Sequence, residues 1–183
     1  MIFGTDHAVL AARAAPDEDR AMSLARYLRD AAVFAPCYVV LDWASYIAPL
    51  GPFNITPWNP QPALAVVWML LGGLHHLPVV FGTVFLADVL VRAAPAGYAL
   101  TLATSALLAL GYGAIALGLR RLPGFDAGLR STRDLTLLSA TTLAGTALGG
   151  AAFVGVLLGT TPLLEGDFLE TWLRFWIGDA VGV

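Results

Sequence analysis

The sequence predicts an all-α fold: a polytopic transmembrane helix bundle of about six spans, two of them short and broken. Of its 183 residues, 58% are hydrophobic and only 13% are charged, whereas soluble domains carry about 25% charged residues. Several apolar runs approach the roughly 20 residues that a helix needs to cross a bilayer. Arginines gather between these runs, as they do in the loops of membrane proteins. Most of the surface is therefore expected to face hydrocarbon.

Six apolar segments are predicted to enter or cross the membrane. They are residues 31–50, 60–74, 77–92, 97–119, 134–159 and 171–183. The second and third are the short ones, and glycines and a proline separate them. Residues 1–30 carry acids and arginines and are predicted to form a cytoplasmic tail with an interfacial helix that starts near Pro16. The chain is thus expected to divide into a tail, 1–30, and a membrane bundle, 31–183, that is incomplete at its C-terminus.

The arginines orient the predicted bundle. One cluster precedes the first span, and a second lies between the fourth and fifth: Arg13, Arg20, Arg26 and Arg29, then Arg120, Arg121, Arg130 and Arg133. Four crossings separate the clusters, so both fall on the same side of the membrane. Because basic residues concentrate in cytoplasmic loops, we expect that side and the N-terminus to be cytoplasmic.

Composition excludes several classes of function. The net charge of −3 gives no basic face for a nucleic-acid partner. Cys37 is the single cysteine, so no internal disulfide forms. His75 and His76 are neighbours that point about 100° apart on a helix, which suits a solvated turn better than a metal or haem site. No nucleophile, phosphate-loop or dinucleotide motif is present. We therefore expect no catalytic residue, no metal and no cofactor in this chain.

Three aspartates fall inside apolar spans, where a charge is costly unless it is solvated, paired or protonated. On the predicted topology all three lie in the outer half of the membrane. The proline-rich segment 54–61 enters from that side, and irregular backbone is tolerated there where it lines a wet cavity. We expect a ligand-binding pocket that opens outward, built from Asp42, Trp58, Asn59, Gln61, Asp88 and Asp179. The alternative is that each aspartate makes a structural hydrogen bond or pairs with Arg92 or Arg174.

Glycines four residues apart mark the fifth span: Gly145, Gly149, Gly155 and Gly159. Small residues at this spacing let helix backbones approach closely in lipid. Helix packing within the bundle is the predicted role, and a homodimer face is the alternative. The five tryptophans stand mostly near predicted span ends, which is typical of an interfacial aromatic belt.

The order of several motifs resembles a known family. Ile-Thr-Pro-Trp-Asn-Pro at 55–60 precedes an apolar span, a Leu-Gly-Gly break at 71–73 and Phe-Leu-Ala-Asp at 85–88. A late tryptophan pair is followed by Gly-Asp-Ala-Val-Gly at 178–182. This pattern is similar to the first type of membrane-associated sensor domain, the MASE family, over residues 31–183.

The resemblance implies a multi-pass input module of the bacterial inner membrane that detects a ligand or membrane partner. It implies regulation of a cytoplasmic output, such as a histidine kinase or a cyclic-dinucleotide enzyme. Relatives continue past the glycine-aspartate block, so the chain is expected to be truncated within that block or to be a stand-alone relative. The implied partners are the lipid bilayer and an output domain or membrane protein. A second copy of the chain is the partner that the glycines of the fifth span would bind as a homodimer face.

Two other functions fit the same residues. An accessory transmembrane subunit of a larger complex would act by helix packing alone. A small transporter-like protein would use the aspartates to bind a coupling cation, although the sequence has no visible paired repeats.

Overall fold

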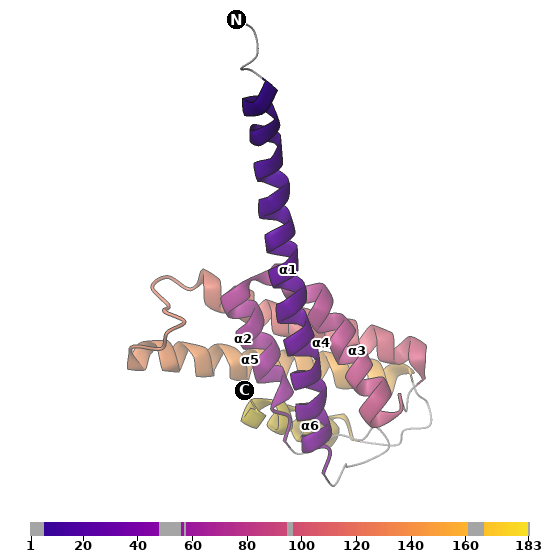
Figure 1. The fold of residues 1–183 in the computed structure, drawn as a ribbon. Coiled ribbons are helices and arrows are strands. Elements are labelled where there is room, and N and C mark those ends of the chain that lie inside the picture. Colours follow the sequence, from indigo (N-terminus) through magenta and orange to yellow (C-terminus); the bar gives the residue numbers. More distant parts are fainter. Residues whose placement is uncertain (1–5, 48–55, 57, 95–96, 161–166, 183) are drawn as a thin grey trace, which may run out of the picture. The chain divides into compact units, whose positions relative to one another are not determined.

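In this computed structural model, the structure describes residues 6–47, 56, 58–94, 97–160 and 167–182, with side chains from residue 23 onward. Within these residues all regular secondary structure is helical, which confirms the predicted all-α class (Figure 1). The elements are α1 (Asp6–Ser45), α2 (Gln61–Gly72), the 3-10 turn η1 (Leu74–His76), α3 (Leu77–Arg92), α4 (Tyr98–Arg121), α5 (Thr132–Thr160) and α6 (Phe168–Gly182).

The chain divides into two compact units, residues 1–36 and 37–183. In the first unit, α1 begins at Asp6, ahead of the predicted helix start near Pro16, and it continues without a break into the predicted first span. Arg29 and Asp30 form an exposed ion pair on this helix. The second unit contains the rest of the described chain and carries the site analysed below.

Three helical segments of the described chain are long and apolar enough to cross a membrane: Leu74–Arg92, Tyr98–Arg121 and Thr132–Thr160. They coincide closely with the predicted third, fourth and fifth spans, but the third was expected to be short and, together with η1, has 19 residues. Helix α2 is apolar but short, as predicted. A total of six spans stays a prediction. The predicted span ends at residues 50 and 183, and the motif positions 55 and 57, lie outside the described residues.

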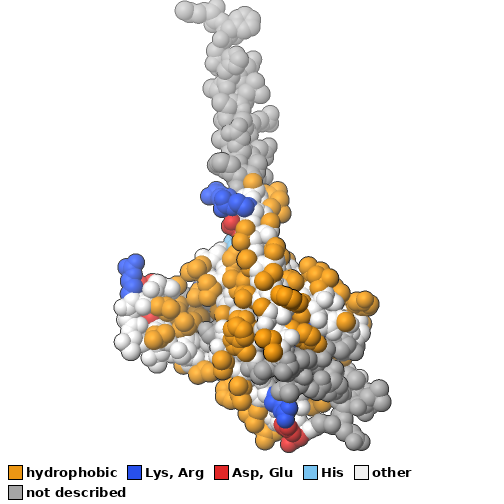
Figure 2. Space-filling view, turned by 60° about the horizontal axis from the view of Figure 1, so that its bottom comes forward, with side chains coloured by type: hydrophobic (Ala, Val, Ile, Leu, Met, Phe, Trp, Pro, Cys, Tyr) orange, Lys and Arg blue, Asp and Glu red, His pale blue; other side chains and the backbone are white. Residues whose placement is uncertain are grey.

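Helix α4 is the centre of the second unit, because it packs against α2, α3 and α5, and α5 in turn packs against α6. Gly113 allows the close packing on α4, since a Cβ there would stand only 3.2 Å from Leu77 Cδ1. The outward faces of these helices are apolar, with Leu148 74% and Leu71 67% exposed. Hydrophobic side chains dominate the face shown in Figure 2. This surface suits a lipid bilayer.

The turn between α2 and α3 is more tightly packed than the sequence predicted. Gly73 ends α2 with a φ of 109°, a backbone conformation that favours glycine. His76 is 5% exposed and stacks on Trp68 with ring centroids 4.0 Å apart. The prediction of a solvated turn is therefore wrong for His76, whereas His75 is exposed. Gly72 makes the burial of His76 possible, because a Cβ at position 72 would collide with the imidazole of His76.

The four glycines singled out in α5 have different surroundings. A Cβ on Gly145 would collide with the side chain of Ile115 on α4, so Gly145 lies at a close helix contact. A Cβ on Gly155 would meet Phe168 only at ordinary distance, 3.9 Å. A Cβ on Gly149 or Gly159 would have no described atom within 4 Å. The homodimer face stays a prediction.

Two tryptophans predicted for an interfacial belt join α6 to α5. The indole of Trp172 donates to the carbonyl of Ala147 at 2.9 Å, and that of Trp176 donates to Leu143 at 3.1 Å. The two indoles stack at 5.6 Å. An indole N–H within a membrane bundle needs such an acceptor, so these side chains help to fix the position of α6.

The two glycines at 145 and 149 provide a matched test of helix packing. Gly145→Val should lower the free energy of unfolding by about 1–3 kcal/mol, because the added methyl groups overpack the contact with Ile115. Gly149→Val should change it little, since the added atoms enter open space. Thermal unfolding of both variants in one detergent measures the difference. Equal loss of stability in the two variants would contradict this packing.

Candidate functional site

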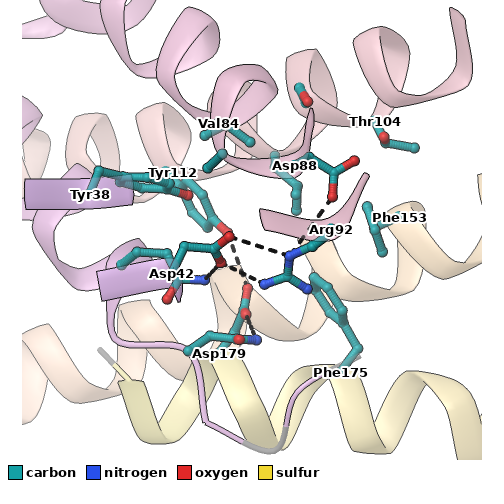
Figure 3. Close-up of a pocket in the computed structure, with 15 residues that line it drawn as sticks. Tyr38, Asp42, Val84, Asp88, Arg92, Thr104, Tyr112, Phe153, Phe175 and Asp179 are labelled. Carbon is teal, nitrogen blue, oxygen red and sulfur yellow. Dashed lines mark hydrogen bonds and ion pairs between the residues drawn. The ribbon is translucent and has the colours of Figure 1, made fainter. Parts of the chain in front are cut away.

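Side chains from all six α-helices of the described chain meet around one internal cavity of about 60 Å³ (Figure 3). Five of the six predicted ligand-binding residues line it: Asp42, Asn59, Gln61, Asp88 and Asp179. Trp58 does not line this cavity and is 46% exposed. The structure therefore brings together acidic residues from α1, α3 and α6 with the amides of Asn59, just before α2, and Gln61, its first residue.

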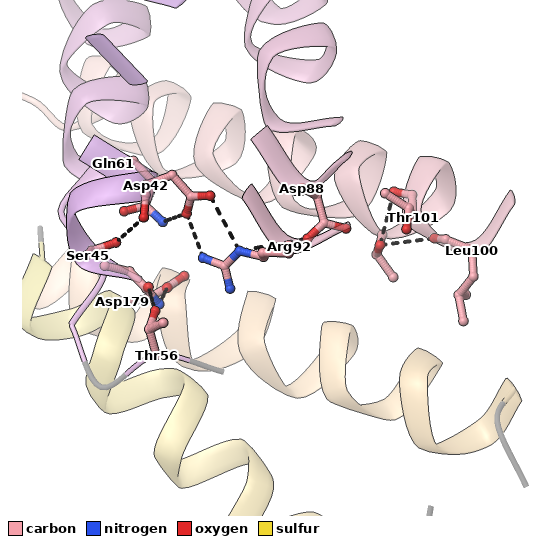
Figure 4. A network of polar contacts seen from close by, with 11 residues as sticks. Asp42, Ser45, Thr56, Gln61, Asp88, Arg92, Leu100, Thr101 and Asp179 are labelled. Atoms are coloured by element: carbon pink, nitrogen blue, oxygen red, sulfur yellow. Dashed lines mark hydrogen bonds and ion pairs between the residues drawn. The ribbon is translucent and has the colours of Figure 1, made fainter. Parts of the chain in front are cut away.

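The first half of the site is an ion-pair cluster around Arg92 (Figure 4). Arg92 Nη2 lies 2.6 Å from Asp42 Oδ1, and Arg92 Nε lies 3.5 Å from Asp42 Oδ2 and 3.8 Å from Asp88 Oδ1. Gln61 Nε2 donates to Asp42 Oδ1 at 2.6 Å. Asp42 is 2% exposed. A carboxylate buried this deeply requires such partners, because an unpaired charge is strongly disfavoured away from water.

The ends of three helices place these groups. Asp42 stands in the last turn of α1, Gln61 is the first residue of α2 and Arg92 is the last residue of α3. Ala93 takes a left-handed φ of 59° and ends α3 directly after Arg92. Asp88 is one helical turn before Arg92, a spacing that brings the two side chains together. A cation at a helix C-terminus is also favoured by the helix dipole.

The second half of the site centres on Asp179, which is 3% exposed. Its Oδ1 accepts a hydrogen bond from Asn59 Nδ2 at 2.9 Å, and its Oδ2 accepts one from the Tyr112 hydroxyl at 3.3 Å. Thr56 donates its hydroxyl proton to Asn59 Oδ1. Phe153 and Phe175 stack at 4.5 Å and close this side of the cavity. Asp179 is thus held by neutral donors, unlike Asp42.

Backbone contacts dock the segment before α2 onto the end of α6. The amide of Asn59 donates to the carbonyl of Gly178 at 3.0 Å. A Cβ on Gly182 would collide with the carbonyl oxygen of Asn59 and crowd the nitrogen of Pro60. The Trp-Asn-Pro and Gly-Asp-Ala-Val-Gly motifs are therefore two sides of one contact, in which glycine permits the close approach and Asp179 binds the asparagine side chain.

The structural alternative fits all three aspartates as well: Asp42 and Asp88 contact Arg92, and Asp179 accepts hydrogen bonds from Asn59 and Tyr112, while all three line the cavity. Arg174 instead pairs with exposed Glu170 on its own helix. Sequence reasoning missed Tyr38 and Tyr112 as lining residues. A weak signal existed for Tyr38, which stands one helical turn before Asp42 and so shares its face.

The fold and site define a class: an all-helical membrane domain whose helices converge on a buried, charged cavity. The chain matches the MASE1 family over residues 31–183, so it belongs to this family of membrane-associated sensor domains. No curated protein and no solved structure matches the chain.

The Arg92–Asp42 pair predicts strong coupling between the two side chains. Arg92→Met should lower the free energy of unfolding by about 3–5 kcal/mol, because it leaves a buried carboxylate without its cation. Adding Asp42→Asn should recover part of that loss, and thermal unfolding of the four proteins of the double-mutant cycle measures this. The control is Arg174→Met in the exposed pair with Glu170, which should cost less than about 1 kcal/mol. Additive effects at 42 and 92 would contradict the coupling.

The docking contact predicts that Gly182 tolerates no side chain. Gly182→Ala should lower the free energy of unfolding by about 1–3 kcal/mol, because the new methyl group pushes the Asn59 backbone away from α6. Gly159→Ala is the control, since a Cβ at that position meets no described atom within 4 Å. Thermal unfolding of both variants is the measurement, and an unchanged midpoint for Gly182→Ala would be incompatible with the contact.

Proposed function

We propose that this chain is a sensory input domain that detects a ligand or a membrane partner and regulates a cytoplasmic output such as a histidine kinase. The observation that carries the proposal is the convergence of all six described α-helices on one polar cavity. A stimulus acts only through different affinities for two arrangements of a protein. A group bound in this cavity would contact several helices at once, so its affinity depends on how they are arranged.

The proposed switch is the cluster around Arg92. Its partners come from the ends of α1 and α3, and Gln61 of α2 holds the same carboxylate. A ligand that competes for one of these groups would change the relative stability of the different positions of the helix ends. Because buried charges require partners, the cluster favours discrete pairings over gradual loosening. This behaviour suits a two-state input module.

The proposed location is the bacterial inner membrane, with a cytoplasmic N-terminus. The cavity is lined by Thr104 and Ser105 near the start of α4, whereas Arg120 and Arg121 stand at its end. If the arginine end is cytoplasmic, as the positive-inside rule favours, the cavity lies in the outer part of the bundle. Stimuli would then reach it from outside the cell.

Membership of a sensor-domain family supports the sensory role over the transporter-like and accessory-subunit alternatives. The proposal includes the partners of the chain: a cytoplasmic output domain or a membrane protein, and a second copy of the chain.

A reporter kinase tests this function without knowledge of the stimulus. The whole 183-residue chain, joined to the catalytic core of a histidine kinase, should set a basal kinase activity in cells. Asp88→Asn and Asp179→Asn should change that activity several-fold, because a shift of about 1.4 kcal/mol changes the ratio of two arrangements tenfold. Kinase phosphorylation is measured at matched membrane levels of the protein.

The control is Thr146→Val, which removes a buried hydroxyl that donates to Thr142 within α5 and does not line this cavity. It should leave kinase activity unchanged. Equal activity in all of these proteins, at equal membrane levels, would refute the sensory role of the cavity.

A further inference from the structure

We propose that the arginine-rich end of the bundle binds the headgroup of an anionic phospholipid, in a site formed by His75, Arg120 and Arg121. These residues do not line the central cavity, so the inference goes beyond the proposed sensory role and does not depend on it. Three properties of the described chain carry it: two side-chain donors that converge, arginines whose donors are little used, and the depth at which α4 ends.

The side chains of His75 and Arg120 approach one point at the turn that follows α2. A Cβ built on Gly73 would stand 3.0 Å from His75 Nδ1 and 3.4 Å from Arg120 Nη1. The two nitrogen atoms come from different elements, η1 and α4, and lie close enough for one phosphate group to contact both. Imidazole and guanidinium N–H groups both donate to phosphate oxygens. Both side chains are exposed, so a headgroup can reach them.

Two of the arginines at this end are already engaged within the loop between α4 and α5. Arg130 pairs with Asp126 at 3.6 Å. Arg133 donates to two backbone carbonyls of the loop, at 2.8 Å and 3.3 Å. These two side chains therefore hold the loop together and are less available to an external anion.

Arg120 and Arg121 keep most of their donors available. Arg120 Nη1 makes two long contacts with carbonyls at the end of α2, at 3.4 Å and 3.5 Å, beyond the usual range for an N–H···O hydrogen bond. Arg121 is exposed and has no hydrogen bond or ion pair with the described residues. A guanidinium carries five N–H donors that match phosphate geometry. A phosphate group would use donors that the described chain leaves idle.

The length of α4 places this end at the depth of the headgroups. The helix has 24 residues and is about 36 Å long at a rise of about 1.5 Å per residue, whereas the hydrocarbon core is about 30 Å thick. Its last two residues are Arg120 and Arg121. Leu71, beside a carbonyl that Arg120 contacts, is 67% exposed. The site thus borders an apolar surface that suits acyl chains, which favours a phospholipid over a soluble anion.

The test uses the purified full chain in a neutral detergent, with dioctanoyl phosphatidylglycerol, dioctanoyl phosphatidylcholine and inorganic phosphate as probes at equal ionic strength. Thermal unfolding is followed by tryptophan fluorescence across a concentration series of each probe. Phosphatidylglycerol should raise the unfolding midpoint in a saturable manner, whereas phosphatidylcholine and inorganic phosphate should not. An equal effect of the two lipids, an equal effect of inorganic phosphate, or no saturable effect of any probe would overturn the proposal.

Variants locate the binding. Arg121→Gln should weaken the apparent affinity for phosphatidylglycerol about fivefold, which corresponds to the roughly 1 kcal/mol that one arginine contributes near an anionic surface. Arg120→Gln should weaken it as much. Arg130→Gln is the matched control, because it removes the same charge from the same end of the bundle but from a side chain paired with Asp126, and it should keep the affinity of the wild-type chain.

Two outcomes would overturn the site. Unchanged affinity in both Arg120→Gln and Arg121→Gln is the first, and the Arg121 variant should fold normally because that side chain is exposed. The second is equal weakening by Arg121→Gln and Arg130→Gln, which would show general charge attraction without a site. Because no kinase is present, either failure is distinct from failure of the sensory role, which the reporter kinase measures separately.

Discussion

A guanidinium buried between two carboxylates constrains how three helix ends meet. Arg92 is only partly accessible and Asp42 is almost fully buried, and neither charge is tolerated alone in a low-dielectric interior. The last turn of α1, the end of α3 and the first residue of α2 therefore have to stay within hydrogen-bond reach of one another. Separation of these ends would leave a buried charge without its partner, which is strongly disfavoured.

A second constraint joins segments that are far apart in the sequence. Asn59 binds α6 through its backbone amide and through its side chain, to Gly178 and Asp179 respectively. Gly182 is the glycine whose missing side chain makes this approach sterically allowed. Because Gln61 follows Asn59 by two residues, the same short segment belongs to both halves of the site. The segment therefore connects α6 to the ion pair on α1 and α3 through hydrogen bonds.

Much of the fold and part of the site follow from the sequence through the energetics of burial. Long apolar runs predict α3, α4 and α5 within a few residues, and aspartates in hydrocarbon predict a polar centre because charges there need partners. The sequence predicts less well how each helix is rotated about its axis, because adjacent residues point about 100° apart and a small error in rotation changes which of them is buried. This explains why Gly150, which packs against Phe175, was missed beside Gly149, and why Tyr112 and the burial of His76 were not predicted.

The same energetics bear on why the cavity is polar at all. Replacing a buried ion pair with well-packed apolar residues is often neutral or stabilising, and a bundle with an apolar exterior needs no charge to stay in a membrane. Charges at Asp42, Asp88, Arg92 and Asp179 are therefore poorly explained by stability alone. They are explained if different arrangements of the helix ends pair these groups differently, because a ligand bound in the cavity would then stabilise one pairing over another. In that case the pairing of these charges would make the bundle responsive to a ligand.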